Sequence, residues 1–130
     1  MAGLTNYAED LVLDWLFTTG SATRPTSWYV ALYTVAPGEG GGGTEVSGGS
    51  YARVSATFTV SGTAPTTASN SAAVEFAEAT GNWGTIVAAG IFDSLSSGNL
   101  IAFANLTTSK AIDTGDVLRF NVGALDITLD

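Results

Sequence analysis

The sequence predicts a mainly β fold: an antiparallel, jelly-roll-like β-sandwich with one N-terminal α-helix. Short segments rich in β-branched and aromatic residues recur between Gly-, Pro- and Ser-containing turns, which is typical of sandwiches and barrels. Apolar residues make up 45% of the chain and charged residues only 12%, so Gly, Ser, Thr and Asn must supply much of the surface. The 130 residues match the usual length of one domain, and we expect a single β-sandwich domain over residues 1–130.

The helix is expected at about residues 4–18. Asn6 can cap its first turn, with Glu9 completing a capping box, and Gly20 can end it. An apolar stripe at helical spacing is expected to cover the β core; it consists of Leu4, Ala8, Leu11 and Trp15.

Leu13 and Phe17 lie outside that stripe. At 100° per residue they fall about 180° and 220° from Leu4, on the side that also carries Asn6 and Asp10. They form an i, i+4 apolar pair. We predict that the pair docks against a neighbouring subunit; the alternative is that helix tilt, or residues 18–25 folding back, covers it.

The strands are expected at residues 27–35, 50–60, 72–76, 85–93, 100–106, 117–122 and 125–129, with a turn at residues 61–68. The first carries bulky side chains on both faces, which predicts burial on both sides or a position at a subunit interface. Most of the core is expected from Trp28, Val30, Leu32, Val54, Phe58, Val74, Phe76, Ile86, Ile91, Phe92, Leu100, Ile101, Phe103, Leu118, Phe120 and Ile127.

A glycine-rich loop between the first two strands is the second candidate contact surface. So much glycine is costly to order, which favours a surface position and a contact. Arg53, one of four cations among twelve carboxylates, predicts either a bidentate bond to a carboxylate, in this subunit or the next, or a weak surface pair. The candidate interface residues are Leu13, Phe17, Gly41, Gly42, Glu45 and Arg53.

Composition excludes several functions. The net charge of −8 argues against nucleic-acid partners, which require clustered Lys and Arg. Without cysteine or histidine there is no disulfide, and the commonest general base and metal ligand are missing. Neither a signal peptide nor a membrane span is recognisable, so we expect a soluble protein made in a cytoplasm, with no membrane partner.

No motif predicts catalysis or a cofactor. Asp113-Thr-Gly115 matches the aspartic-protease triplet, but the following Asp116 and strand indicate an ordinary turn. Asp93, Asp113 and Asp116 offer fewer oxygens than Ca²⁺ requires, and the glycine-rich loop lacks the Gly-Lys-Ser/Thr of a phosphate-binding loop. We expect no enzyme activity and no cofactor.

An ordered set of stretches covers nearly the whole chain. It consists of Trp28-Tyr-Val-Ala-Leu-Tyr-Thr34, Gly43-Thr-Glu-Val-Ser-Gly-Gly-Ser-Tyr-Ala-Arg53, Ala73-Val-Glu-Phe-Ala-Glu-Ala-Thr80, Trp83-Gly-Thr-Ile86, Gly90-Ile-Phe-Asp93 and Leu125-Asp-Ile-Thr-Leu129. In this set the sequence resembles short virion proteins of tailed bacteriophages, labelled head-decoration, minor tail or tail-fibre proteins. The resemblance implies a structural, non-enzymatic component of the particle.

Within that class, the sequence predicts first a capsid decoration (cement) protein on the outer surface of the virion, because strong acidity disfavours contact with packaged DNA. Its partners would be the major capsid protein or other virion subunits, and it would form a homo-oligomer. The main alternative is a tail component: a fibre module, a tube protein or a baseplate adaptor. A third possibility is a carbohydrate-binding module for host attachment, with a stacking platform of Trp28, Tyr29, Tyr51 and Trp83.

Overall fold

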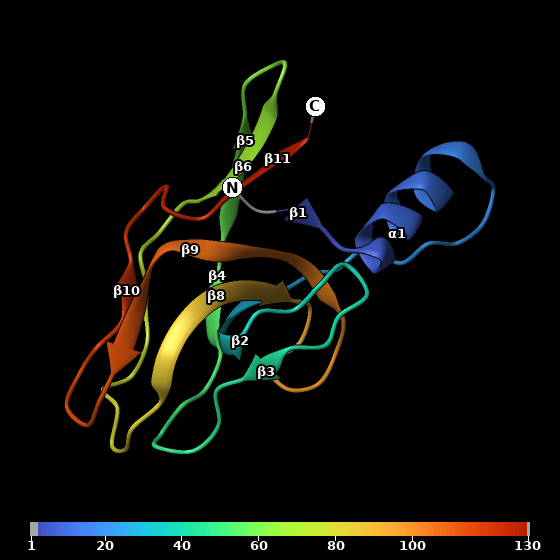
Figure 1. Ribbon diagram of the computed structural model, residues 1–130. Helices are drawn as coiled ribbons and strands as arrows, with labels where there is room; N and C mark the ends of the chain where they lie inside the picture. The colour runs from blue at the N-terminus through green and yellow to red at the C-terminus, as the bar shows by residue number, and fades with distance from the viewer. Residues whose placement is uncertain (1–2, 130) are drawn as a thin grey trace.

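The computed structural model describes residues 3–129 and shows antiparallel β-sheets with one helix near the N-terminus (Figure 1), which confirms the predicted fold class. The elements are, in order, β1 (Gly3–Leu4), α1 (Asn6–Phe17), β2 (Trp28–Val35), β3 (Thr44–Glu45), β4 (Val54–Ala56), β5 (Phe58–Ser61), β6 (Thr66–Asn70), β7 (Val74–Glu75), β8 (Gly84–Phe92), β9 (Leu100–Ile112), β10 (Arg119–Phe120) and β11 (Asp126–Leu129).

The strands divide unequally between three sheets. A six-stranded sheet has the order β1-β9-β8-β2-β3, with β4 also pairing with β2; β11-β6-β5 and β10-β7 form smaller sheets. Every pairing is antiparallel. A regular jelly roll has eight strands in two sheets. Here, one large sheet is faced by two small ones, so the second layer covers only part of the first.

β2 is buried on both faces over residues 30–33, as its two bulky faces predict. It pairs with β8 along one edge and with β3 and β4 along the other. Val30 and Leu32 on one face enter the main core, which includes Phe76. Ala31 and Tyr33, on the other face, belong to a second, smaller cluster. The strand is therefore covered on both sides within a single chain.

Half of the predicted core residues are fully buried. These are Val30, Leu32, Val74, Phe76, Ile86, Ile91, Phe92 and Leu118. The others are only half-buried: Trp28, Val54, Phe58, Leu100, Ile101, Phe103, Phe120 and Ile127. Two of these, Leu100 and Phe103, lie on the face of the large sheet that carries Ala31 and the second, smaller cluster, not on the face of the main core.

Strand boundaries differ from the prediction where polar residues continue or interrupt a strand. The expected strand at residues 50–60 is divided into β4 and β5, which belong to different sheets. β9 runs on through polar residues to Ile112, and β6 begins inside the expected turn at residues 61–68. The two-residue strands β1 and β3 were not predicted; each is held by pairing with a longer strand rather than by its own sequence.

The N-cap of the helix lies one residue earlier than predicted. Thr5, not Asn6, is the N-cap, and its hydroxyl accepts a hydrogen bond from Ala8 N at 3.3 Å. The expected core-covering stripe is wrong: Ala8 is the only buried residue of α1, and Trp15 is 67% exposed. The reason is that α1 projects from the margin of the large sheet, near β1 and β9, instead of lying across a sheet face (Figure 1).

Candidate functional site

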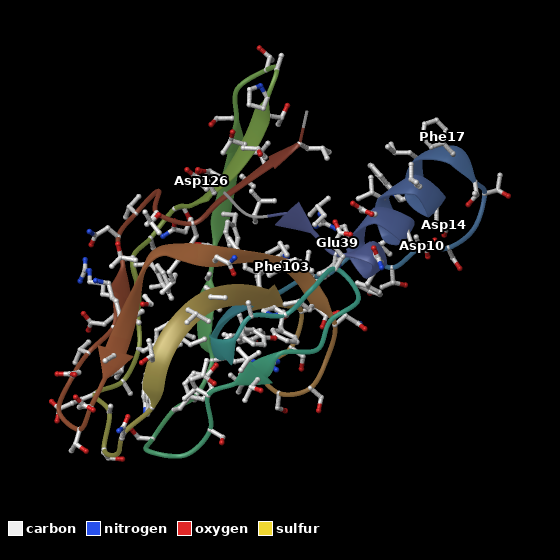
Figure 2. All side chains as sticks on the ribbon, in the orientation of Figure 1. Asp10, Asp14, Phe17, Glu39, Phe103 and Asp126 are labelled. Atoms are coloured by element: carbon white, nitrogen blue, oxygen red, sulfur yellow. The ribbon has the colours of Figure 1, made fainter. Side chains whose placement is uncertain are left out.

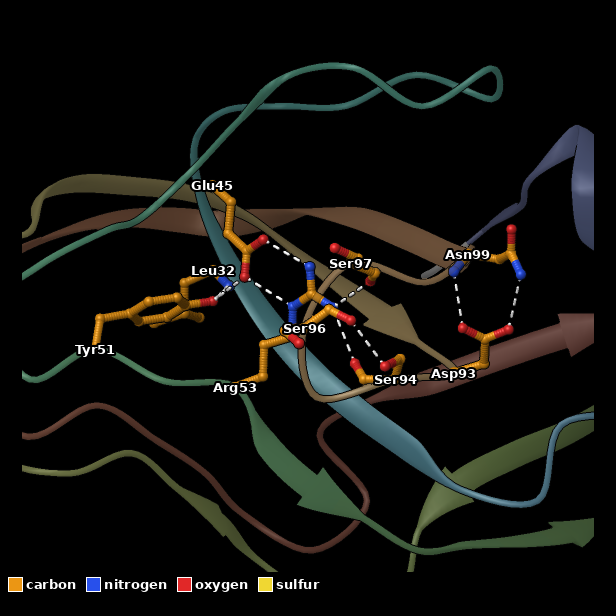
Figure 3. Close-up of polar contacts among 9 residues, drawn as sticks. All are labelled: Leu32, Glu45, Tyr51, Arg53, Asp93, Ser94, Ser96, Ser97 and Asn99. Atoms are coloured by element: carbon orange, nitrogen blue, oxygen red, sulfur yellow. Dashed lines mark hydrogen bonds and ion pairs between the residues drawn. The ribbon is translucent and has the colours of Figure 1, made fainter.

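Two predicted interface residues, Arg53 and Glu45, bind each other within the chain (Figure 3). Glu45 lies at the end of β3, and Arg53 immediately precedes β4. Nη2 of Arg53 donates to Oε1 of Glu45 at 2.8 Å, and Nε donates to Oε2 at 2.9 Å. Of the two predicted carboxylate partners, the structure shows the one in the same subunit. The Arg53 side chain is only 7% exposed, so this is a largely buried ion pair.

The same guanidinium also holds the turn between β8 and β9. Its Nη1 donates to the carbonyl oxygens of Ser94 at 2.9 Å and Ser97 at 2.7 Å. The cation lies 3.6 Å from the centre of the Phe92 ring, a cation–π contact. Arg53 thereby joins β3, β4 and the 94–97 turn, and four of its five N–H groups donate to acceptors inside the chain.

Tyr51 extends the network into the core. Its hydroxyl donates to Oε2 of Glu45 at 2.7 Å and accepts from the backbone N–H of Leu32 at 3.0 Å. Burial raises the pKa of Glu45, but the hydrogen bonds from Arg53 and Tyr51 outweigh it and hold that pKa below its ordinary value. Burial, followed by the hydrogen bond to Glu45, raises the pKa of Tyr51. Burial and the nearby Glu45 charge raise the pKa of Tyr33 to about 12. The network is thus a charged carboxylate held by one neutral phenol, Tyr51, and one cation, Arg53.

Gly41 and Gly42 lie at the tip of the glycine-rich loop and have positive φ angles. A Cβ added to either would meet no atom within 4 Å, so both are open on the outside of the chain. The loop is tied to the helix, since the carbonyl oxygen of Glu39 accepts from Asn6 N at 3.0 Å. Between the loop, the first turn of α1 and the 98–100 segment lies a pocket of about 380 Å³. The loop is therefore an ordered wall of a pocket.

Leu13 and Phe17 are exposed, at 57% and 78%. Neither the tilt of α1 nor residues 18–25 covers them. Figure 2 shows Phe17 together with Asp10 and Asp14 on the part of α1 that projects from the sheets. Two further apolar side chains of the same helix are exposed, Trp15 at 67% and Leu16 at 56%. Sequence reasoning missed these two because it assigned Trp15 to the core and gave Leu16 no role.

The four aromatic residues predicted as a carbohydrate platform do not form one. Trp83 is 4% exposed, and its indole N–H donates to the Gly49 carbonyl at 2.8 Å. Tyr51 packs edge-on against Trp83 and stacks with Phe76, with ring centroids 5.4 and 6.1 Å apart. Two of the four residues are thus part of the main core cluster rather than a surface.

The described residues contain no arrangement typical of a catalytic or metal site. Asp113 to Asp116 form a turn in which Asp113 N donates to a carboxylate oxygen of Asp116 at 2.9 Å. Within residues 3–129, no three carboxylate side chains gather closely enough to hold a metal ion. No helix in this range is long and apolar enough to cross a membrane.

Comparison with known proteins gives one family match. A family model described as "Podophage GP4 fiber I protein gp80" matches residues 3–128, which is nearly the full length of the chain. The match includes the projecting helix, the glycine-rich loop and all three sheets. None of the curated proteins compared with the chain matches it.

Proposed function

Because the chain belongs to the gp80 family of podophage fibre proteins and is a structural component of a tailed-phage virion, we propose that its place in the particle is the tail fibre. The single observation that carries this proposal is the family match over residues 3–128. That match confirms the resemblance found in the sequence to short virion proteins of tailed bacteriophages.

The family description favours the tail alternative over capsid decoration, the first function that the sequence predicted. Strong acidity, which suggested an outer position away from packaged DNA, fits a fibre as well as it fits a cement protein. Acidity disfavours the DNA-filled interior but does not distinguish one outer position from another. The tail position therefore replaces the capsid lattice in the proposal, and the partners become other tail subunits.

The role we propose is mechanical rather than catalytic. The family is one of structural fibre proteins, and a part of this kind acts by holding its shape and its contacts. The buried Arg53–Glu45 pair and the two-sided burial of β2 supply the shape. The exposed end of α1 and the open tip of the glycine-rich loop are the surfaces best placed for contacts. Homo-oligomerisation and a single-domain organisation stay predictions.

Position and copy number in purified particles test the proposal. Antibody raised against the chain should label the tail in negative-stain electron micrographs, and quantitative mass spectrometry should find far fewer copies than of the major capsid subunit. Label spread over the head, with a copy number close to that of the capsid subunit, would restore the decoration function and overturn the fibre proposal.

A further inference from the structure

The last turns of α1 form an exposed apolar tip. We call it the apolar peg; it consists of Leu13, Trp15, Leu16 and Phe17. Each of these side chains is more than half exposed. Leu13, Leu16 and Phe17 are i, i+3 and i, i+4 neighbours on the helix surface, and Trp15 lies on another side of the same last turns. Exposed apolar groups that lie together, unlike scattered ones, mark interaction sites in soluble proteins. The peg lies away from the sheets, at the far end of the projecting helix (Figures 1 and 2).

The helix backbone that carries the peg is held at both ends before any partner binds. Thr18 caps the end of the helix: its backbone N–H and its hydroxyl both donate to the Asp14 carbonyl oxygen, at 3.1 and 2.7 Å. At the other end, Thr5 N donates to the Ile101 carbonyl at 2.9 Å and anchors the helix to β9. A preformed surface loses little conformational entropy on association, so its apolar contacts count more fully toward affinity.

The electrostatics of α1 select the partner. Glu9, Asp10 and Asp14 give the helix three carboxylates, and its last turn contains no basic residue. The C-terminal end of a helix also carries a partial negative charge. A surface that covers the peg must therefore combine apolar side chains with cations at its rim.

A second copy of this chain meets that requirement poorly. Of its four basic side chains, only Arg53 is buried, in its pair with Glu45. The exposed cations Arg24, Lys110 and Arg119 stand against twelve carboxylates and a net charge of −8, so two copies of the chain repel each other and offer few cations for a basic rim. An anionic membrane is disfavoured for the same reason, because the helix carboxylates would face lipid headgroups of like charge.

We propose that the apolar peg inserts into an apolar pocket, rimmed by Lys or Arg, on a different subunit of the virion tail. This rests on the proposed function, since it assumes that the chain is a tail component. The sequence predicted a contact through Leu13 and Phe17. The structure adds Trp15 and Leu16 to the contact surface, and the charges of α1 add the chemistry expected of the partner. In this mode of binding, the end of a helix inserts into an apolar groove, and a few large side chains contribute most of the affinity.

The test uses the full chain and tail-complete particles that lack this protein, purified from a phage in which its gene is deleted. Binding is measured by co-sedimentation. Leu13→Ser with Phe17→Ser should weaken binding about tenfold or more. The matched control, Val60→Ser with Val122→Ser, changes side chains that are 70% and 63% exposed elsewhere, and should bind like wild type. Both variants should melt near the wild-type temperature.

A second binding experiment tests the requirement for cations at the rim of the partner's pocket. Wild-type binding should weaken with added salt, and Glu9→Gln with Asp10→Asn should bind less tightly and depend less on salt. If wild type fails to bind any particle, the proposed function fails together with the inference. If wild type binds but the peg variant binds equally well, only the inference is overturned.

Two further outcomes would assign the peg to another occupant. Light scattering that shows a wild-type oligomer, absent in the peg variant, would make the partner a second copy. Flotation with vesicles of phosphatidylcholine and phosphatidylglycerol, lost in the peg variant, would make it a membrane. Either result overturns the proposal of a basic-rimmed subunit.

Discussion

Arg53 and Glu45 form two hydrogen bonds of 2.8 and 2.9 Å with each other, and through Arg53 this pair also holds the 94–97 turn. The pair lies at the junction of β3, β4 and the β8–β9 connection. Removing one partner of a buried pair leaves the other charge without compensation, which is far more costly than losing a surface pair. The arrangement of these strands therefore depends on a single side chain, that of Arg53.

Arg53→Lys should destabilise the protein by about 1.5–3 kcal/mol, because an ammonium group cannot make the planar, two-point bond to Glu45 and also reach both turn carbonyls. Urea unfolding followed by tryptophan fluorescence measures the change. Arg119→Lys is the matched control: its pair with Glu75 is 3.5 Å long and more than half exposed, so the change should stay within about 0.5 kcal/mol. Equal, small effects at both positions would show that the Arg53 network does not stabilise the fold.

The bidentate bond of Arg53 could be predicted from the sequence, but its location could not. A lone Arg on a strand among many carboxylates indicates an ion pair, whereas the choice of Glu45 depends on β3, a two-residue strand held only by its pairing with β2. Similarly, β2 was predicted to be buried on both sides because its two faces are bulky. Trp83 was missing from the predicted core, because the sequence next to a loop is compatible with a binding platform as well as with the more common core position.

The projecting helix was the largest difference from the sequence prediction. Its period and length were recognisable, but its direction is set by Thr5, which caps α1 and at the same time donates its hydroxyl proton to the Leu100 carbonyl at 2.6 Å. A local pattern such as Asn6-x-x-Glu9 cannot reveal that second, long-range bond. Two of the four peg residues, Leu13 and Phe17, were predicted as a contact because the helical period placed them outside the apolar stripe. Part of the candidate site could therefore be predicted from the sequence.

Acid should weaken the Glu45 network. A carboxyl group whose pKa is lowered by folding stabilises the protein above its unfolded-state pKa, and that contribution is lost as the pH falls through the folded-state value. The ordinary value for Glu45 is 4.5, so the loss should occur below it. Glu45→Gln should be much less stable than wild type at neutral pH, and the gap should shrink as the pH falls below 4.5. A gap that is constant with pH, in urea titrations, would show that the charge of Glu45 does not contribute.

Two neighbouring glycines should respond differently to the same substitution. Gly42 and Gly43 have φ angles of +83° and +76°, so alanine is strained at both by about 1–2 kcal/mol. A Cβ on Gly42 would meet nothing within 4 Å, whereas on Gly43 it would lie 2.6 Å from the Val35 carbonyl oxygen. Gly43→Ala should therefore cost about 1–3 kcal/mol more than Gly42→Ala in thermal or urea unfolding. Equal losses of stability in the two variants would show that the backbone near Val35 moves aside at no cost in free energy.

Thr5 should control how firmly α1, and with it the peg, is anchored to the body. Its side chain is buried, accepts from Ala8 N and donates to β9, so Thr5→Ala removes the helix cap and leaves the Leu100 carbonyl without this partner. We expect a loss of about 1–2 kcal/mol. Hydrogen exchange at the Ala8 amide should become faster, while Thr5→Ser, which keeps the hydroxyl, should resemble wild type. Because the peg itself is unchanged, weaker binding of Thr5→Ala to particles would show that orientation of the helix contributes to docking. Unchanged exchange at Ala8 would show that the backbone bonds from Thr5 and Asn6 hold the helix without the cap.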